Sequence, residues 1–131
     1  MTMARKAKSI PARSRPKTAA RLSPRLRVYV GDEIALGPGK VELLEAILET
    51  GSISEAAKQL GMSYNRAWLL VRTMNGCFKE PLVQAERGGG TGGGAALTKS
   101  GQAIVALYQQ MTRDTLAATK PAWNELLAYF K

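Results

Sequence analysis

Two short helical segments joined by a three-residue turn are the feature that most restricts the fold of this chain. Ser52 followed by Glu55 forms a capping box, and Gly61 can end the resulting helix because glycine adopts positive φ without steric cost. Ser63 lies two residues further on and is itself a favourable N-cap. A second helix is therefore predicted over about 64–76. Two helices separated by a three-residue turn that contains glycine have the spacing of a helix-turn-helix.

The sequence on either side of this unit predicts the other parts of a winged helix-turn-helix. Apolar residues recur at helical spacing, and short alternating segments bounded by turn residues indicate strands. The hairpin that directly follows the second helix of the unit is the wing. The fold class is expected to be mostly α with small β-hairpins, in a single domain. The predicted flanking elements are strands at 26–30, 34–36, 81–86 and 95–97 and helices at about 39–50, 99–118 and 122–130.

Apolar stripes on these helices, together with one face of the first strand, define a candidate core. Pro121 is expected to separate the last two helical segments, because proline lacks the N–H that a helix interior uses. The predicted stripes are Leu26, Val28 and Val30; Val41, Leu44, Ile47 and Leu48; Ala67, Leu70, Val71 and Met74; Ile104, Leu107, Tyr108 and Met111; and Trp123, Leu126, Leu127 and Phe130.

The net charge of +9 is concentrated at the N-terminus. Residues 1–27 hold nine of the 19 Lys and Arg residues and no acidic residue, so residues 28–131 are neutral overall. We expect residues 1–23 to form a disordered basic arm, residues 24–118 the winged helix-turn-helix domain and residues 119–131 a C-terminal helical extension. The arm is interpreted as a segment that contacts a polyanion, with a solvated tail or an organellar transit peptide as alternatives.

The composition excludes several classes of protein. The absence of histidine removes Ser-His-Asp and Cys-His catalysis and most zinc sites. Cys77 is the single cysteine, which rules out an intrachain disulfide and favours a reducing compartment and a structural role for the thiol. No apolar run approaches the roughly 18–20 residues of a membrane span. A cytoplasmic protein with no membrane partner and no enzymatic activity is expected.

The start of the second helix of the unit carries residue types suited to double-stranded DNA. In a helix-turn-helix this helix enters the major groove with its N-terminal residues at the base edges. Asn65 can pair bidentately with adenine and Arg66 with guanine, while Ser63 and Tyr64 can bond phosphates. Each of the four also has a purely structural interpretation, as a cap, a packing residue or a solvated charge. Further along, Arg72 is a candidate for phosphate alone, and Trp68 is expected to pack rather than to stack on bases.

The glycine tract between the predicted wing strands is a second candidate contact. Gly88, Gly90 and Gly93 match G-x-G-x-x-G, but six glycines in seven residues match almost any glycine pattern. A dinucleotide site would require a βαβ unit, and no Gly-Lys-Ser/Thr ends the tract as in a P-loop. A wing tip is the better interpretation: Arg87 supplies charge, and the bare backbone around Thr91 can approach a phosphate or the minor groove. A loop that makes no contact is the alternative.

The sequence GSISEAAKQLGMSYNRAWLLV at 51–71 resembles the N-terminal DNA-binding domain of the molybdate-responsive ModE regulators. The resemblance extends through GPGKVELLEAI, EPLVQAERGGGTGGGAALT and ALYQQM and covers about 26–118. A looser similarity to LysR-type regulators reflects the shared winged helix.

The resemblance implies a homodimer that associates through helices outside the helix-turn-helix and binds a palindromic operator. It places the recognition residues at Ser63, Tyr64, Asn65, Arg66 and Trp68 and the wing at 87–94. Asn65 and Thr91 depart from the family, where basic residues are common, so base preference and wing charge are expected to differ.

The family's molybdate-binding domains follow the DNA-binding domain and find no counterpart before Lys131. No cofactor is therefore expected in this chain, and molybdate would act through missing domains or a separate sensing partner.

The sequence as a whole predicts a sequence-specific DNA-binding regulator, of repressor type, with genes for molybdate transport or molybdoenzymes as candidate targets. Three alternatives remain at this stage. The first is a non-specific architectural DNA-binding protein driven by the basic arm. The second is an enzyme that holds a nucleotide at the glycine tract. In the third, the dimer binds molybdate directly through backbone amides and basic side chains.

Overall fold

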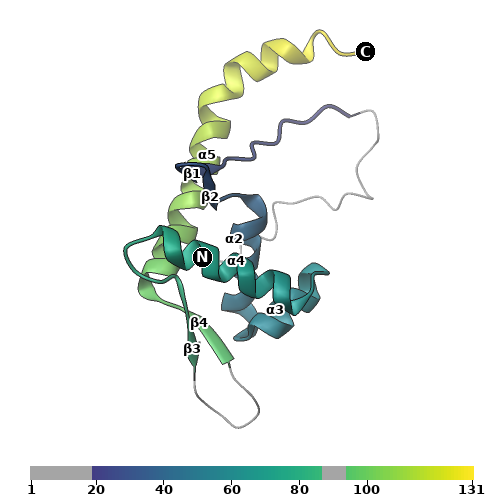
Figure 1. Cartoon of the computed structure of the whole chain (residues 1–131). Coiled ribbons are helices and arrows are strands. Elements are labelled where there is room, and N and C mark those ends of the chain that lie inside the picture. Colours follow the sequence, from purple (N-terminus) through teal and green to yellow (C-terminus); the bar gives the residue numbers. More distant parts are fainter. Residues whose placement is uncertain (1–18, 87–93) are drawn as a thin grey trace.

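The protein is a mostly α-helical domain with two small antiparallel hairpins, as the sequence predicts (Figure 1). A computed structural model describes residues 19–86 and 94–131. The predicted helix-turn-helix is α3 and α4, and the predicted wing is β3 and β4. The elements in chain order are β1 (Val28–Val30), β2 (Glu33–Leu36), α2 (Pro38–Thr50), α3 (Ile53–Leu60), α4 (Tyr64–Cys77), β3 (Val83–Glu86), β4 (Gly94–Leu97) and α5 (Lys99–Leu127).

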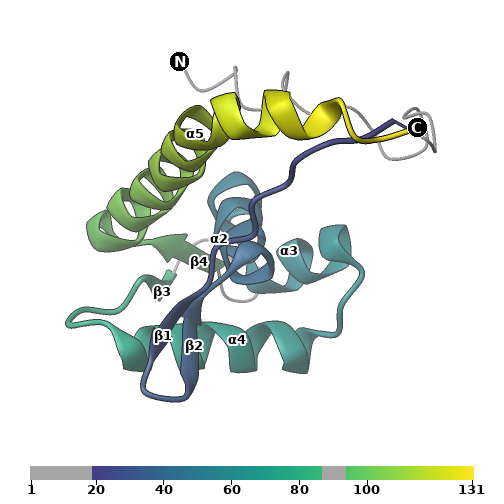
Figure 2. The same cartoon turned by 90° about the horizontal axis from the view of Figure 1, so that it is seen from above.

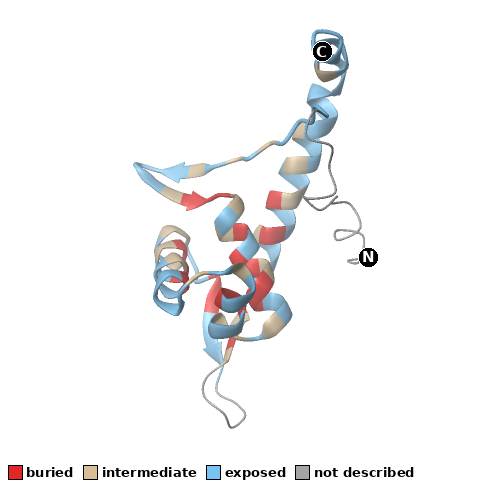
Figure 3. Ribbon diagram, turned by 90° about the vertical axis from the view of Figure 1, so that its right-hand side faces the viewer, coloured by how far each residue is buried: buried red, intermediate tan, exposed pale blue. Residues whose placement is uncertain are grey.

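Helix α2 is the centre of the core. It contacts α3, α4, α5 and β4, and Figure 2 shows it between α5 and α4. The expected residues Val41, Leu44 and Ile47 are buried. Leu43 and Ala46, which lie outside the single stripe that the sequence predicted, are buried as well, because neighbours surround the helix. The prediction of Leu48 as a core residue is wrong, since its side chain is exposed in the last turn of the helix. Figure 3 shows the buried residues gathered where these elements meet.

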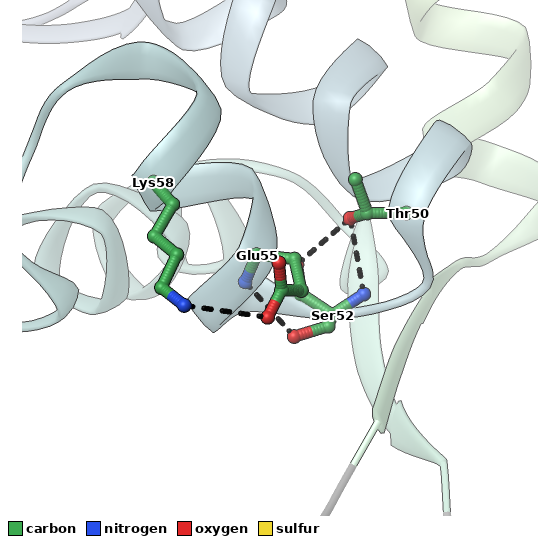
Figure 4. A network of polar contacts seen from close by, with 4 residues as sticks. All are labelled: Thr50, Ser52, Glu55 and Lys58. Carbon is green, nitrogen blue, oxygen red and sulfur yellow. Dashed lines mark hydrogen bonds and ion pairs between the residues drawn. The ribbon is translucent and has the colours of Figure 1, made fainter.

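The joint between α2 and α3 sets the position of the helix-turn-helix. Gly51 ends α2 in the left-handed conformation at φ 73°, and Ser52 caps α3 by accepting a hydrogen bond from the Glu55 amide at 3.1 Å. The Thr50 hydroxyl donates to the Ala46 carbonyl at 2.8 Å and accepts from the Ser52 amide at 3.3 Å. Figure 4 shows the contacts of Ser52 with Thr50 and Glu55, with Lys58 beside Glu55. The joint is therefore held by side chains as well as by backbone bonds.

Small residues and a second glycine bring α3 and α4 together. Ala56 and Ala57 are buried, which lets α3 lie close to its neighbours, and Gly61 ends α3 in the left-handed conformation at φ 68°. On α4, Ala67, Val71 and Met74 are buried as predicted, and Leu70 packs against the core.

The two hairpins attach to the core differently. In the wing, Val83 pairs with Leu97 next to the core, and the Ala95 amide donates to the Gly51 carbonyl at 2.9 Å, which joins β4 to the end of α2. The N-terminal hairpin has an irregular register between Val28 and Tyr29. The predicted burial of Val30 is therefore wrong: alternation ends at the bulge, and Val30 is exposed near the tip.

Helix α5 runs through Pro121 as one element of 29 residues, so the predicted separation at this residue is wrong. Proline removes one backbone donor, and the carbonyl left without it belongs to Ala117, which is exposed and can be solvated by water. The stripe predicted on this helix is only partly correct. Tyr108 is buried and Ile104 packs on the core, whereas Leu107 and Met111 are exposed.

The C-terminal half of α5 extends away from the core (Figures 1 and 3). Leu126, Leu127 and Phe130 are exposed there, and the rings of Trp123 and Phe130 lie with their centroids 6.2 Å apart. Within residues 19–86 and 94–131, no helix is both long enough and apolar enough to cross a membrane.

Candidate nucleic-acid interface

The N-terminus of α4 presents all four predicted recognition residues to solvent. Ser63 caps the helix by accepting a hydrogen bond from the Arg66 amide at 3.1 Å. Tyr64, Asn65 and Arg66 are exposed. The unpaired amides of a helix N-terminus favour a negatively charged ligand, and this end carries no acidic residue in its first turn. A duplex can therefore reach these side chains without any rearrangement of the core.

Trp68 and Arg72 form a pair on the same helix. The Trp68 side chain is 41% exposed, so it lies at the surface of the domain, and the expectation that it packs rather than stacks on bases stays a prediction. Its position follows from helix geometry, because it lies beside the buried stripe of Ala67 and Val71 rather than within it. The Arg72 guanidinium carbon lies 5.3 Å from the centroid of the indole ring, within range of a cation–π interaction. Trp68 therefore supports a positive charge at the surface of α4.

A groove separates α4 from the wing and from the start of α3. Its volume is about 1060 Å³. Tyr64, Trp68 and Arg72 line it on the side of α4, while Gln84 and Ala85 line it on the side of β3. Residues 52–55 also line it, so the exposed N-terminus of α3 borders the same space. The groove therefore brings together the recognition helix, the wing and a helix N-terminus, which are the parts of a winged helix that approach a nucleic-acid backbone.

The predicted tip of the wing lies outside the described residues. This applies to Arg87, Gly88, Gly90, Thr91 and Gly93, whose assignment to DNA contact stays a prediction from the sequence. The described strands place the wing beside the groove: Gln84, Ala85 and Glu86 are exposed on β3. At the other end of the tip, a Cβ on Gly94 would lie 3.1 Å from the Gly51 carbonyl oxygen, which explains why a glycine suits the start of β4.

The charges around the groove have both signs. Glu55 and Lys58 form an exposed ion pair at 3.8 Å on α3, and Glu86 ends β3. On the side of α4, Arg66 and Arg72 supply the positive charge. Burial raises the pKa of Tyr108, and the nearby Arg25 and Arg27 oppose this rise. Tyr108 lies on α5 and does not line the groove. Among the described residues, no cluster of three or more acidic, cysteine or histidine side chains is arranged to hold a metal ion.

The structure adds two residues to the site that sequence reasoning missed. Leu69 is 55% exposed on α4, four residues after Asn65 and therefore on the same side of the helix. Leu69 therefore lies beside the predicted recognition residues, although it lines a second hollow, with Val30 and Glu33, rather than the groove. Asn75 lines the groove and accepts a hydrogen bond from the Leu82 amide, just before β3. The sequence shows only that Asn75 is a poor helix former inside a predicted helix. The residues that it bonds can be identified only from the fold.

Comparison with known proteins agrees with this arrangement. Residues 39–102 match the family model described as bacterial regulatory helix-turn-helix protein, lysR family. The chain is 43% identical over 94 residues to the molybdenum transport protein ModE of Azotobacter vinelandii, and the match covers 72% of this chain and 35% of that protein. It is 41% identical over 88 residues to the DNA-binding transcriptional dual regulator ModE of Escherichia coli K12, covering 67% of this chain and 34% of the relative.

A third relative is the molybdenum-pterin-binding protein MopA of Rhodobacter capsulatus, 48% identical over 71 residues that cover 54% of this chain and 27% of MopA. The chain thus spans about a third of the length of these curated relatives. Among solved structures, the DNA-binding domain of CbnR in complex with DNA superposes with a TM-score of 0.45 at 21% identity, over 69% of this chain and 93% of that domain.

Proposed function

We propose that this protein is a sequence-specific DNA-binding transcriptional regulator, because residues 39–102 match the model of the bacterial lysR-type regulatory helix-turn-helix and the chain is similar to part of ModE. The observation that carries the proposal is the exposed N-terminus of α4, which presents Ser63, Tyr64, Asn65 and Arg66 beside the groove that the wing borders. Catalysis has no part in this function, which consists of occupying an operator and thereby hindering or recruiting polymerase.

Each exposed residue of α4 has a role that follows from its chemistry. Asn65 and Arg66 read base edges in the major groove, where a bidentate pair contributes roughly 1–3 kcal/mol of discrimination. Ser63 and Tyr64 bond phosphates at the positive end of the helix dipole. Arg72 contacts a phosphate across the groove. Trp68 acts through Arg72, whose guanidinium it holds at 5.3 Å.

The wing supplies the second contact to the duplex. Arg87 adds charge to its tip, and the glycines at 88, 90 and 93 around Thr91 give a backbone that approaches a phosphate or the minor groove closely. This role rests on the position of β3 and β4, which border the groove beside α4.

The protein binds a palindromic operator as a homodimer that forms through α5. This helix exposes apolar side chains along most of its length, including Leu107, Met111, Leu116 and Leu126. Its C-terminal half leaves the core, and isolated helices of this length are marginal in water, so a second copy that buries the apolar side accounts for both features. A two-fold dimer would present two α4 helices to half-sites about one helical turn apart.

The genes under control are those of molybdate transport or molybdoenzymes. This part of the proposal rests on the names of the relatives, which are a molybdenum transport protein and a molybdenum-pterin-binding protein. The chain spans about a third of their length, so we assign the sensing of molybdate to a separate partner or to further domains rather than to a cofactor in residues 24–118. The regulator acts in the cytoplasm, without a membrane partner.

Selection of bound sites from random DNA, followed by gel-shift competition at fixed salt, tests the function. Asn65→Ala and Arg66→Ala should each weaken the selected site by about 5–150-fold and leave binding to random DNA nearly unchanged. Gln102→Ala and Arg113→Ala serve as matched controls, because both residues are exposed on α5, away from the groove. Equal losses on selected and random DNA would show that α4 does not read bases.

A non-specific architectural role is the second candidate, and the charge distribution favours it. Residues 1–27 carry nine basic residues and no acid, while the rest of the chain is neutral. Such a protein would show steep salt dependence, with a slope near −0.9 for each phosphate neutralised, and little sequence preference.

A further inference from the structure

The first residue of β3 and the residue before it are bonded to α4 by a single side chain. The Asn75 carboxamide oxygen accepts from the Leu82 amide at 2.8 Å and from the Val83 amide at 3.2 Å. The nitrogen of the same carboxamide donates to the Val83 carbonyl at 3.0 Å. One asparagine therefore takes both a donor and an acceptor from Val83, as a neighbouring strand would. These bonds fix the start of β3 against the side of the recognition helix.

The arrangement needs a donor and an acceptor on one side chain, and the carboxamide of asparagine supplies both. Leu82 is fully buried, so its amide depends on a protein acceptor. Aspartate would keep the acceptor but face the Val83 carbonyl without a donor, and alanine would leave all three backbone groups without this partner. Asparagine is also a poor helix former, which makes its place inside α4 unexplained by local preference.

The opposite side of the same segment is bonded to α5 by different groups. The Thr98 amide donates to the Leu82 carbonyl at 2.9 Å, and the Thr98 hydroxyl donates to the Pro81 carbonyl at 2.8 Å. Gly101 packs so close to Leu82 that a side chain there would overlap the Leu82 carbonyl. The segment is thus held between two helices, and its hydrogen bonds to the recognition helix come from Asn75.

Asn75 also lines the groove, on the side of α4. Tyr64, Trp68 and Arg72 continue along one wall toward the N-terminus of α4, and Gln84 and Ala85 continue along the other into the wing. Because the hydrogen bonds of Asn75 join α4 to the start of β3, loss of Asn75 should alter how β3 lies relative to α4. The distance between the recognition residues and the wing therefore depends on these three hydrogen bonds.

We infer that Asn75 is a positioning residue that fixes the wing relative to the recognition helix, so that both reach their contacts on one DNA half-site together. The inference rests on the proposed DNA-binding function. Asn75 itself touches no DNA. It acts through β3, and its loss should leave base reading by α4 intact while the wing loses its place on the duplex.

Amide hydrogen exchange of the free protein tests the anchoring step without DNA. In Asn75→Ala, exchange at Leu82 and Val83 should accelerate about tenfold or more, while amides at the centre of α2 keep their wild-type rates. Asn75→Asp keeps the acceptor for both amides and should accelerate their exchange less. Asn65→Ala is the matched control, because it removes the same side chain from an exposed position of the same helix. Unchanged exchange at Leu82 and Val83 in a folded Asn75 variant would overturn the inference, whether or not the protein binds DNA.

Site-directed cleavage of the selected operator then tests the consequence. A cleavage reagent is attached to Glu86→Cys on β3 or to Gln59→Cys on α3, each in a Cys77→Ser background that removes the other thiol. Asn75→Ala should spread or shift the cuts made from position 86 and leave the cuts from position 59 in place. Identical cuts from position 86 with and without Asn75→Ala would overturn the inference. Failure of the wild-type protein to select any site would count against the proposed function alone, since the exchange measurement still decides the anchoring.

Discussion

Gly101→Ala should destabilise this domain even though alanine is the better helix former. Gly101 lies in the first turn of α5, where Thr98 caps the helix by accepting from the Gly101 amide at 3.0 Å. A Cβ at this position would lie 2.2 Å from the Leu82 carbonyl oxygen, which is 0.8 Å inside the 3.0 Å that real Cβ contacts respect. The obstacle is backbone of a fully buried residue, so it cannot turn aside as a flexible side chain would.

The size of the effect follows from what must move. To relieve the overlap, α5 must move away from Leu82. This movement strains the hydrogen bond from the Thr98 amide to the Leu82 carbonyl. Overpacking of this kind costs about 1–3 kcal/mol, and the weakened hydrogen bond adds about 1 kcal/mol. The gain in helix propensity from glycine to alanine offsets at most about 1 kcal/mol. With the full offset, the expected net loss in the free energy of unfolding is about 1–3 kcal/mol.

Urea unfolding followed by circular dichroism measures this loss, and Gly76→Ala provides the control. Gly76 lies inside α4 with no atom within 4 Å of the position of a Cβ, so alanine there should stabilise the protein by up to about 1 kcal/mol. The two variants make the same chemical change and should shift stability in opposite directions. A Gly101→Ala protein as stable as wild type would refute the reasoning, because it would mean that α5 does not pack on Leu82 as described.

Other predictions concern single interactions. Arg72→Ala should reduce the salt slope of DNA binding by about 0.9, whereas an unchanged slope measured by fluorescence anisotropy would exclude a phosphate contact. Ser52→Ala should cost about 1 kcal/mol in urea unfolding, because the Glu55 amide loses its cap; a loss near zero would contradict this. Because burial raises the pKa of Tyr108, its ionisation is disfavoured in the folded state, and stability should fall as pH rises above about 10. That decline should be shallower in Tyr108→Phe, and an equally steep decline would assign it to other groups. Leu126→Glu should convert a dimer into a monomer in sedimentation velocity, and a dimer that persists would place the interface elsewhere than the end of α5.

Helices α3 and α4 could be predicted from the sequence because the residues that cap them act locally. Ser52, Gly61 and Ser63 set the ends of α3 and the start of α4 through bonds to residues within one turn, and the structure has those ends where the caps predict them. The exposure of Asn65 and Arg66 at the start of α4 could be predicted in the same way, because both residues lie beside the buried stripe of that helix.

What the sequence could not predict depends on contacts between distant segments. Leu43 is buried because α2 is surrounded, which a single apolar stripe does not reveal. Pro121 stays within a helix because the carbonyl that it leaves unpaired is open to water. The role of Asn75 requires residues 82 and 83 as partners, and that of Gly101 requires the backbone of Leu82. In each case the sequence shows the residue type, but it does not show which distant segments or solvent surround that residue in the fold.

The central claim is that specificity lies in α4 and the wing rather than in the basic arm. The most direct test compares affinities for the selected operator and for a scrambled duplex, at several salt concentrations, in the full chain and in a chain that lacks residues 1–23. We predict that the operator is preferred by about 10³ or more in both proteins, and that removal of the arm lowers both affinities and the salt slope together. A preference near one in the full chain, or a preference that disappears with the arm, would contradict the claim and identify a non-specific polyanion-binding protein.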